Sequence, residues 1–406
     1  MKVLQINAVY KQGSTGKIVY DIHRELIKHG TISTICYGQG EKSKEPGIYR
    51  LVGTPYAKLQ ALESRITGLM YGGCRLSTQR LIRIIQTEKP DIVHLHCING
   101  HFVNIYRIIK WLKDNKMKTV LTLHAEFMYT ANCGHSLECE KWKTGCGKCP
   151  RLKKETKSWL FDRTHDSWLK MKEAFEGFSQ DLVVVSVSPW LMERASQSPI
   201  LRKMKHVTIL NGIDTDVFKP YKTDDLKASL GLSVTAKTIL HVTADFSLNT
   251  DHIKGGYYVS DIANRMKNDN VQFIIAGPYD QTKKYPSNML MLGRITNQVE
   301  LAKLYSMADI TLLTSKKETF SMIVAESLCC GTPIVGFEAG APEQIAINEH
   351  CDFVTFGDVE ALEKTLREKI ACLKDSDKIS RSASEKYAKN IMSKKYYDLY
   401  EDVLLP

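Results

Sequence analysis

The chain has 406 residues, 43% of them hydrophobic and 25% charged, which is the composition of an ordinary globular protein long enough for two domains. Its longest apolar stretch, residues 182–187, is far shorter than the ~20 residues that cross a bilayer, so we expect no membrane span. The first residues, MKVLQINAVY, indicate a β-strand rather than a signal peptide, so we expect a cytoplasmic protein. The net charge of +11 favours an anionic partner, but charge alone does not choose between a nucleic acid, a nucleotide and a membrane surface.

Strand-like and helical patterns alternate along the chain in two series. The first series has apolar runs at residues 3–9, 31–37, 92–97, 119–123, 182–187 and 207–210, with helical patterns such as 17–29 and 102–113 between them. The second series begins at Thr238 and continues through residues 271–276, 289–292, 310–313 and 334–337. Such alternation is typical of parallel sheets covered by helices, so the sequence predicts an α/β protein with two Rossmann-like domains.

The domain boundaries follow from turn signals and composition. We expect a first domain over residues 1–212, which ends at the Asn211-Gly212 turn signal, and a polar linker over 213–235. A second domain is then expected over 236–385, followed by a charged terminal helix over 386–406.

The first loop, YKQGSTGK at residues 10–17, joins the first strand to the first helix. Gly13 and Gly16 would let the backbone approach a phosphate at the amino end of that helix. The loop is not a Walker motif, because Lys11 occupies the place of the first glycine and Ile18 that of the Ser or Thr. A tight strand-to-helix turn without a ligand is an equally good interpretation of the residues alone.

Four cysteines, Cys133, Cys139, Cys146 and Cys149, lie close together within an insertion at residues 133–150. Without a secretion signal, the chain's eleven cysteines indicate reduced thiols rather than a disulfide framework. Four thiolates can surround one tetrahedral zinc ion, and they leave no open position for catalysis. We therefore predict a structural zinc site, with incidental free cysteines or a redox pair at Cys146 and Cys149 as the alternatives.

The segment that follows is basic and aromatic. Residues 141–163 hold eight basic residues against two acidic ones, interleaved with Trp142, Trp159, Leu160 and Phe161. Basic side chains attract anionic lipids, and tryptophan settles at the headgroup level of a bilayer. The segment therefore predicts peripheral contact with an anionic membrane face, the alternative being a solvated basic loop.

Residues 310–345 read as a strand, a turn carrying Glu318, a helix from Phe320 to Cys330 and a further strand. In such a βαβ unit, Glu318, Thr319 and the amides of Phe320 and Ser321 share the edge where ligands bind. Glu326 lies eight residues after Glu318. Carboxylates on either side of a phosphate site suit the hydroxyl groups of a nucleotide sugar.

The Glu-x7-Glu spacing, with FSM after the first Glu and GTPIV and GAPE beyond the second, resembles the donor site of family 4 retaining glycosyltransferases of the GT-B fold. Residues 139–150 resemble the branch that includes colanic-acid and O-antigen enzymes. The resemblance covers nearly the whole chain. It implies two Rossmann-like domains that face a central cleft, with the terminal helix crossing back to the first.

The resemblance also assigns roles to residues. Glu326 would hold the ribose and Glu318 the donor sugar, while Lys254, Gly13, Gly16 and the amides of Phe320 and Ser321 would contact the diphosphate. His124, in Thr-Leu-His, would lie beside the transferred sugar. For His94 and His96, a structural role and an acceptor-side role remain equally open. Ala244-Asp245 stands where most members have Gly-Arg, so a second cation is missing or comes from elsewhere, with Arg294 as a candidate.

These observations predict an enzyme that transfers a hexose, with retention and without a catalytic metal, from a UDP- or GDP-sugar to a polyprenyl-diphosphate-linked glycan of a bacterial surface polysaccharide. The alternatives are a nucleotide-sugar epimerase of the same fold and a zinc-containing nucleic-acid-binding protein. The second alternative explains the cysteines and the charge but neither Glu318 nor Glu326, so no nucleic-acid partner is expected.

Overall fold

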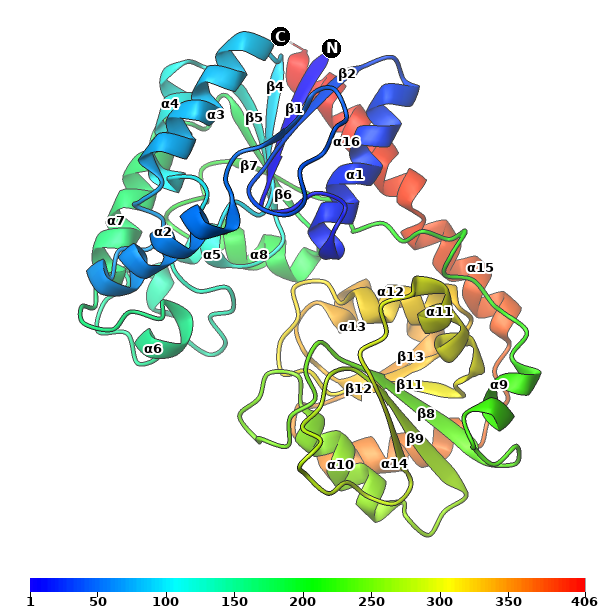
Figure 1. Ribbon diagram of the computed structural model, residues 1–406. Coiled ribbons are helices and arrows are strands. Elements are labelled where there is room, and N and C mark those ends of the chain that lie inside the picture. Colours follow the sequence, from blue (N-terminus) through cyan, green and yellow to red (C-terminus); the bar gives the residue numbers. More distant parts are fainter. Residues whose placement is uncertain (406) are drawn as a thin grey trace. The chain divides into compact units, whose positions relative to one another are not determined.

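The computed structural model describes residues 1–405, which form two compact units (Figure 1). Unit 1 comprises residues 1–210 together with the residues from Met392 onward, and unit 2 comprises Asn211–Ile391. The stretch 213–235, which the sequence predicts as a linker, lies in unit 2 and contains the short helix α9 (Asp224–Ser229). No helix in the described part of the chain is long and apolar enough to span a membrane.

Unit 1 is built on one parallel sheet of seven strands in the order β3-β2-β1-β4-β5-β6-β7. The strands are β1 (Lys2–Asn7), β2 (Ile32–Tyr37), β3 (Ile48–Arg50), β4 (Ile92–Leu95), β5 (Lys118–Leu123), β6 (Leu182–Ser186) and β7 (Lys205–Thr208). The central strands are almost wholly buried, because helices cover both faces of the sheet.

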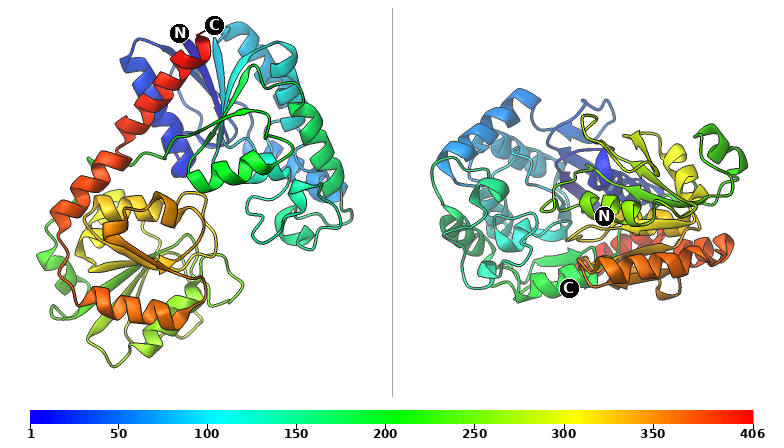
Figure 2. Two further views of the ribbon diagram at one scale, coloured as in Figure 1. Left: turned by 180° about the vertical axis from the view of Figure 1, so that it is seen from behind. Right: turned by 90° about the horizontal axis from the view of Figure 1, so that it is seen from below.

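Two helices far apart in the sequence cover one face of this sheet. Helices α1 (Gly13–Lys28) and α16 (Lys389–Leu404) run side by side there, blue and red in Figure 2. Their apolar side chains, including Ile22, Leu26, Met392 and Leu399, pack with Val3 of β1 in one core cluster. Helices α3 (Arg75–Glu88), α4 (Ile105–Asp114) and α7 (Thr164–Phe175) cover the opposite face (Figure 1).

Unit 1 contains further helices between its strands. These are α2 (Thr54–Thr67), α5 (Phe127–Thr130), α6 (Leu152–Glu155) and α8 (Pro189–Gln197). Helices α5 and α6 flank the cysteine-rich insertion, which contains the 3₁₀-helix Lys141–Lys143.

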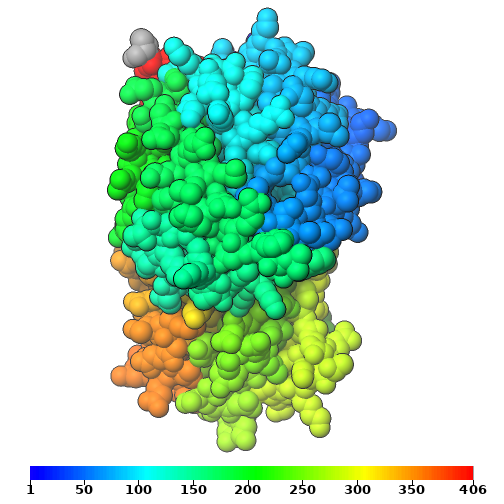
Figure 3. Space-filling view, turned by 90° about the vertical axis from the view of Figure 1, so that its left-hand side faces the viewer, coloured from blue at the N-terminus to red at the C-terminus, as the bar shows by residue number. Residues whose placement is uncertain are grey.

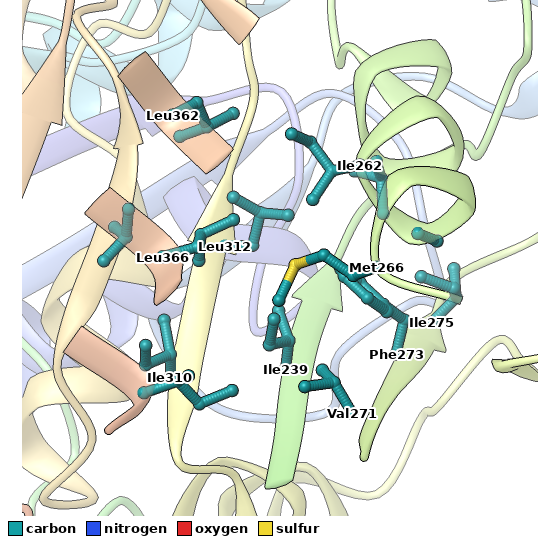
Figure 4. Close-up of a cluster of buried hydrophobic side chains, with 14 of the residues drawn as sticks. Ile239, Ile262, Met266, Val271, Phe273, Ile275, Ile310, Leu312, Leu362 and Leu366 are labelled. Carbon is teal, nitrogen blue, oxygen red and sulfur yellow. The ribbon is translucent and has the colours of Figure 1, made fainter. Parts of the chain in front are cut away.

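Unit 2 repeats the arrangement with a parallel sheet of six strands in the order β10-β9-β8-β11-β12-β13. They are β8 (Lys237–Val242), β9 (Val271–Ala276), β10 (Met289–Gly293), β11 (Ile310–Leu313), β12 (Ile334–Phe337) and β13 (Cys351–Val354). Helices α10 (Gly256–Arg265) and α14 (Val359–Ile370) close one face over the buried side chains in Figure 4. Helices α11 (Gln298–Met307), α12 (Met322–Cys329) and α15 (Ser376–Tyr387) lie on the other.

Two predicted helices differ from the observed ones. The helix expected from Phe320 begins at Met322, because Ser321 adopts φ 76° and ψ 90°, which no helical residue can have. The charged terminal helix expected over 386–406 begins at Lys389, because Ala388 is extended with φ −57° and ψ 137°. Ala388 forms a parallel bridge with Ile213, and this pairing separates α15 from α16.

Both sheets reverse their strand order once, between β1 and β4 in unit 1 and between β8 and β11 in unit 2. In open parallel sheets, ligands bind outside the carboxyl ends of the strands at such a reversal. The Gly13 loop follows β1 and His96 follows β4. Lys254 lies in the connection after β8, and Glu318 follows β11. Each unit therefore carries predicted site residues at its own reversal point.

Candidate active site

Lys254 and Glu318 form an ion pair at the reversal point of unit 2. The Lys254 Nζ donates to Glu318 Oε1 over 2.7 Å, and the two side chains are only 27% and 13% exposed. Lys316 and Lys317 directly precede Glu318 in the sequence, yet the ion pair of Glu318 is with Lys254. Partial burial lowers the effective dielectric around the pair, so the cation and the carboxylate hold each other in place.

The backbone around Lys254 is fixed against the end of β11. Thr314 Oγ1 donates to the carbonyls of Lys254 and Gly255 over 3.2 and 3.0 Å. Gly255 has φ +67°, and a Cβ there would lie 2.0 Å from the Thr314 carbonyl oxygen. No side chain fits at position 255, so this glycine permits the close approach that brings Lys254 to Glu318.

Glu318 is held by a second strand connection. Its amide donates to Ala339 O over 2.9 Å, and its carbonyl accepts from the Ala341 amide over 3.3 Å. Glu343 accepts from the amides of Ala339 and Gly340 over 3.0 and 2.8 Å, which fixes this GAPE turn. The loops after β11 and β12 thus form one rigid support for the Glu318 carboxylate.

The amino end of α12 lies directly after this support. Ser321 is its N-cap residue, yet its side chain makes no capping hydrogen bond, and Phe320 and Thr319 precede it in buried positions. The Ser321 hydroxyl is buried and has no hydrogen-bond partner within residues 1–405. A left-handed backbone at a residue with a side chain costs free energy and is found preferentially at functional sites. The arrangement leaves the positive end of α12 able to bind an anion.

Glu326 lies in the second turn of α12 and accepts a hydrogen bond from Tyr305 on α11 over 3.2 Å. Tyr305 is fully buried, and burial followed by the nearby Glu326 carboxylate raises its pKa well above the usual value. The phenol therefore stays protonated and acts as a donor that orients Glu326. Tyr305 was not predicted from the sequence. The only feature that could have pointed to it is a tyrosine among the apolar residues of the predicted helix.

In unit 1, the predicted glycine loop forms the start of α1. Gly13 adopts φ +63° as the first residue of the helix, and a Cβ at Gly16 would lie 3.2 Å from both the Lys11 amide nitrogen and Val9 Cγ2. Helix α1 has no side-chain cap and no acidic residue in its first turn. Its amino end therefore keeps the positive field that a diphosphate prefers.

Three histidines of unit 1, His94, His96 and His124, lie close together at the ends of β4 and β5. His94 lies within 2.6 Å of the Tyr400 hydroxyl and 2.7 Å of Thr122 Oγ1, which anchors α16 to the sheet. His96 Nδ1 lies 3.3 Å from His124 Nε2. Both His94 and His96 are fully buried, which favours the structural role over contact with an acceptor. His124 is partly exposed, and burial lowers its pKa to about 4, so it is neutral at pH 7.

Two positions bear on the missing second cation. Asp245 occupies the position where most members of the resembled family have arginine. Its Oδ2 lies 3.3 Å from His252 Nε2. Arg294 is exposed and follows the edge strand β10, two strands away from β8 in the sheet order. The sheet order thus separates Arg294 from the Lys254 loop, and its contact with a donor stays a prediction.

The four cysteines of the insertion lie near one another. Burial, then Glu155 and the thiols of Cys149, Cys146 and Cys139 raise the pKa of Cys133. However, among residues 1–405 no three His, Cys, Asp or Glu side chains are arranged so that they could hold a metal ion. Cys146 Sγ instead donates to the Thr130 carbonyl over 3.6 Å. The donor set suits zinc, but its thiols would have to turn toward a common centre, so zinc stays a prediction.

The chain is similar in sequence to known proteins. The family model "Glycosyl transferases group 1" matches residues 250–389, which include Lys254, Glu318 and Glu326. The protein named "Putative colanic acid biosynthesis glycosyl transferase WcaC" of Escherichia coli (strain K12) is 22% identical over 361 residues and 85% of each chain.

Solved structures show the same fold. A sucrose-phosphate synthase from Thermosynechococcus elongatus superposes with a TM-score of 0.66 at 14% identity, over 99% of both chains. Anabaena HepE in complex with UDP superposes with a TM-score of 0.63 at 13% identity, over 99% of this chain and 100% of that one. The matched domain and the similarity to WcaC support a family 4-like glycosyltransferase, and the solved structures share its two-sheet GT-B fold.

Proposed function

We propose that the enzyme transfers a hexose from a UDP- or GDP-linked donor to a lipid-linked glycan of a bacterial surface polysaccharide, with retention of configuration and without a catalytic metal. The Lys254–Glu318 pair carries this proposal. A lysine beside the amino end of α12 provides positive charge for the departing diphosphate, which is the role that a metal ion has in other transferases. Glu318 then accepts hydrogen bonds from the sugar, and Glu326 from the ribose.

Two similarities support the donor and the pathway. HepE has been crystallised with UDP and with UDP-glucose, and it shares the fold of this chain. WcaC is described as a colanic acid enzyme, which favours a surface polysaccharide as the product. His124, partly exposed at the end of β5, is the proposed neighbour of the transferred sugar.

A panel of nucleotides and nucleotide sugars tests this proposal. A ligand that binds the native state raises the melting temperature, so UDP and GDP identify the base by which of them stabilises the protein. Chromatography of products from the corresponding nucleotide sugars then separates the reaction classes. A transferase releases the nucleoside diphosphate and needs an acceptor, whereas an epimerase converts the sugar without one. Failure of every nucleotide to stabilise the protein would contradict the proposal.

Unit 1 has an exposed apolar surface, which we call the apolar rim and propose as the contact with the lipid-linked acceptor. It consists of exposed side chains from the carboxyl half of α2 and from the turn after α6: Leu62, Ile66, Trp159, Leu160 and Phe161. The two segments are joined by a hydrogen bond from the Trp159 amide to the Arg65 carbonyl over 2.9 Å. They lie side by side on the face of unit 1 in Figure 3.

The charge around the apolar rim favours an anionic lipid surface. Trp159, Leu160 and Phe161 are 57%, 67% and 56% exposed, which is unusual for three consecutive large apolar residues. Lys153, Lys154 and Lys157 precede them and are also exposed. Lysines near a lipid surface contribute about 1 kcal/mol each, and inserted aromatic rings add to this. We infer that the rim rests on an anionic membrane face where a polyprenyl-diphosphate-linked acceptor is held.

A further inference from the structure

Three polar side chains, on or directly after the adjacent strands β1, β4 and β5 of unit 1, form a hydrogen-bonded series that ends at His124. Gln5 comes from β1, His96 follows β4, and His124 follows β5. Gln5 and His96 have no exposed surface. Gln5 Oε1 lies 3.2 Å from His96 Nε2, and His96 Nδ1 lies 3.3 Å from His124 Nε2. Burying a glutamine in an apolar strand costs free energy unless its amide group is hydrogen-bonded.

The orientation of the Gln5 amide is fixed by its second contact. Its Nε2 lies 3.4 Å from the carbonyl oxygen of Val19 on α1, and only an amide nitrogen can donate there. The amide oxygen must therefore face His96. Because an amide oxygen only accepts, His96 Nε2 must carry a proton.

The remaining protons follow in sequence. Burial, then the nearby His94 and His124, lower the pKa of His96 well below its usual value, so at pH 7 its ring is neutral and carries one proton. With that proton on Nε2, His96 Nδ1 is an acceptor. His124 Nε2 must then donate to it, and His124, which is also neutral, then carries no proton on Nδ1.

We propose that Gln5 is a positioning residue that acts through His96 to hold His124 in the tautomer protonated on Nε2. This inference rests on the proposed function only in that His124 lies beside the transferred sugar. In this tautomer His124 Nδ1 can accept a hydrogen bond from a hydroxyl group but cannot donate one. Gln5 is fully buried and does not contact the substrate. Through His96 it determines whether His124 Nδ1 accepts or donates a hydrogen bond.

The neighbouring hydrogen bonds provide a matched control. Thr122 Oγ1 lies 2.7 Å from His94 Nε2 and 2.9 Å from the Tyr396 hydroxyl, and Thr122 is as deeply buried as Gln5. His94 stacks on His96 with ring centroids 3.8 Å apart, but the hydrogen bonds of Thr122 do not reach His124. A Thr122→Val variant loses buried hydrogen bonds of similar cost without altering the Gln5–His96–His124 series.

The first test uses the wild-type protein with ¹⁵N-labelled histidine at pH 7. Protonated and unprotonated ring nitrogens have well-separated ¹⁵N shifts, and His124→Ala assigns the resonances of His124. We expect His96 and His124 both to be neutral and protonated on Nε2. An Nδ1-protonated or charged His124 would overturn the proposal, whatever the behaviour of any variant.

The second test replaces Gln5 by methionine, which has a similar volume and no donor or acceptor of comparable strength. Val19 O lies within α1 and keeps its helical hydrogen bond, so the change is confined to His96. We expect the Nε2 resonance of His124 to shift toward a mixture of tautomers in Gln5→Met and to stay unchanged in Thr122→Val. Once a donor and an acceptor are identified, kcat of Gln5→Met should be about tenfold lower than that of the wild type, while KM for the donor is unchanged.

Unchanged His124 resonances in a folded Gln5→Met protein would overturn the proposal. The proposed function fails separately, because the tautomers are measured without turnover. If His124→Ala transferred sugar at the wild-type rate, His124 would have no place beside the sugar, although the NMR result would stand.

Discussion

Lys254 Nζ and Glu318 Oε1 lie 2.7 Å apart, although 64 residues separate them in the sequence. The two residues meet because β8 and β11 are neighbours at the reversal of the sheet, so the loops after both strands emerge at one point. Without a ligand the carboxylate neutralises the lysine, and a bound diphosphate would compete for the same cation. In the proposed function, the pair would therefore link the group that binds the sugar to the group that stabilises the leaving phosphate.

Replacing Lys254 by methionine should lower kcat about 100-fold, because a preorganised cation at developing negative charge has an effect of that order. The matched control is Lys237→Met at the amino end of β8. Lys237 forms an ion pair of similar exposure with Asp309 over 3.1 Å, at the end of the strand away from the site. Steady-state kinetics should separate the two variants. Equal activity in both would remove Lys254 from the mechanism.

Glu326→Ala should abolish transfer at low donor concentration while leaving the fold intact, because a partly exposed helix position tolerates alanine. Tyr305→Phe should raise KM for the donor more modestly, since it removes only the hydroxyl that orients Glu326. Thermal stabilisation by the preferred nucleotide should fall in both variants. Glu300→Ala, an exposed change on α11, should leave it unchanged. Normal stabilisation of Glu326→Ala would argue against ribose binding.

The central strands could be predicted from the sequence because they are buried on both faces. Strands β9, β11 and β12 begin and end where their apolar runs do. The short edge strands β3 and β13 were not predicted, since each is partly exposed and lacks a continuous apolar pattern.

The site was only partly accessible from the sequence. Lys254 and Glu318 were each named, but their pairing depends on which strands are neighbours. The φ of Ser321 depends on the loop that precedes α12, and no local pattern predicts a left-handed serine. Gln5 was missed because a single polar residue in an apolar strand does not reveal which nitrogen it will face.

Stability should fall as the pH decreases from about 6.5 to 4. Burial lowers the pKa of both His124 and His241 to about 4, whereas an unfolded histidine titrates near 6.5. Within this window the unfolded chain binds more protons than the folded one, so protonation favours unfolding. Above pH 6.5 these histidines are neutral in both states, so their contribution to the free energy of unfolding no longer changes with pH. Melting temperatures from pH 7.5 to 4.5 measure the effect.

A histidine variant isolates one contribution to this pH dependence. His241 is fully enclosed in unit 2 and lies 3.0 Å from the Leu312 carbonyl through Nδ1. His241→Asn should lose less stability between pH 7.5 and 5 than the wild type, because the variant lacks the buried imidazole. An identical slope in His241→Asn and the wild type would contradict the prediction.

The cysteine cluster makes a prediction that separates metal from catalysis. If Cys133, Cys139, Cys146 and Cys149 hold structural zinc, elemental analysis should find about one zinc per chain, and Cys146→Ser should lower both zinc content and melting temperature. Cys372→Ser, an exposed change in unit 2, should lower neither. EDTA added during the assay should leave the rate nearly unchanged. Pure protein without zinc would eliminate the site, and a requirement for added magnesium or manganese would contradict metal-independent transfer.

The apolar rim predicts binding to anionic vesicles. Wild-type protein should sediment with vesicles that contain anionic lipid, bind less as salt rises, and ignore neutral vesicles, because the lysines supply a screened attraction. Changing Lys153, Lys154 and Lys157 to glutamate should abolish binding. The control changes Lys44, Lys116 and Lys203, exposed lysines elsewhere on unit 1, and therefore alters the net charge by the same amount.

The aromatic part of the rim is tested separately from its charge. Trp159→Ser removes a side chain that is 57% exposed, so it should leave the melting temperature nearly unchanged. Vesicle binding should weaken several-fold at every salt concentration, because the lost contact is apolar and is not screened. If the control triple variant lost binding as completely as the Lys153, Lys154 and Lys157 variant, general positive charge rather than the rim would hold the protein on the lipid. If wild-type protein ignored anionic vesicles at low salt, the membrane proposal would fail, while the assignment as a glycosyltransferase would stand.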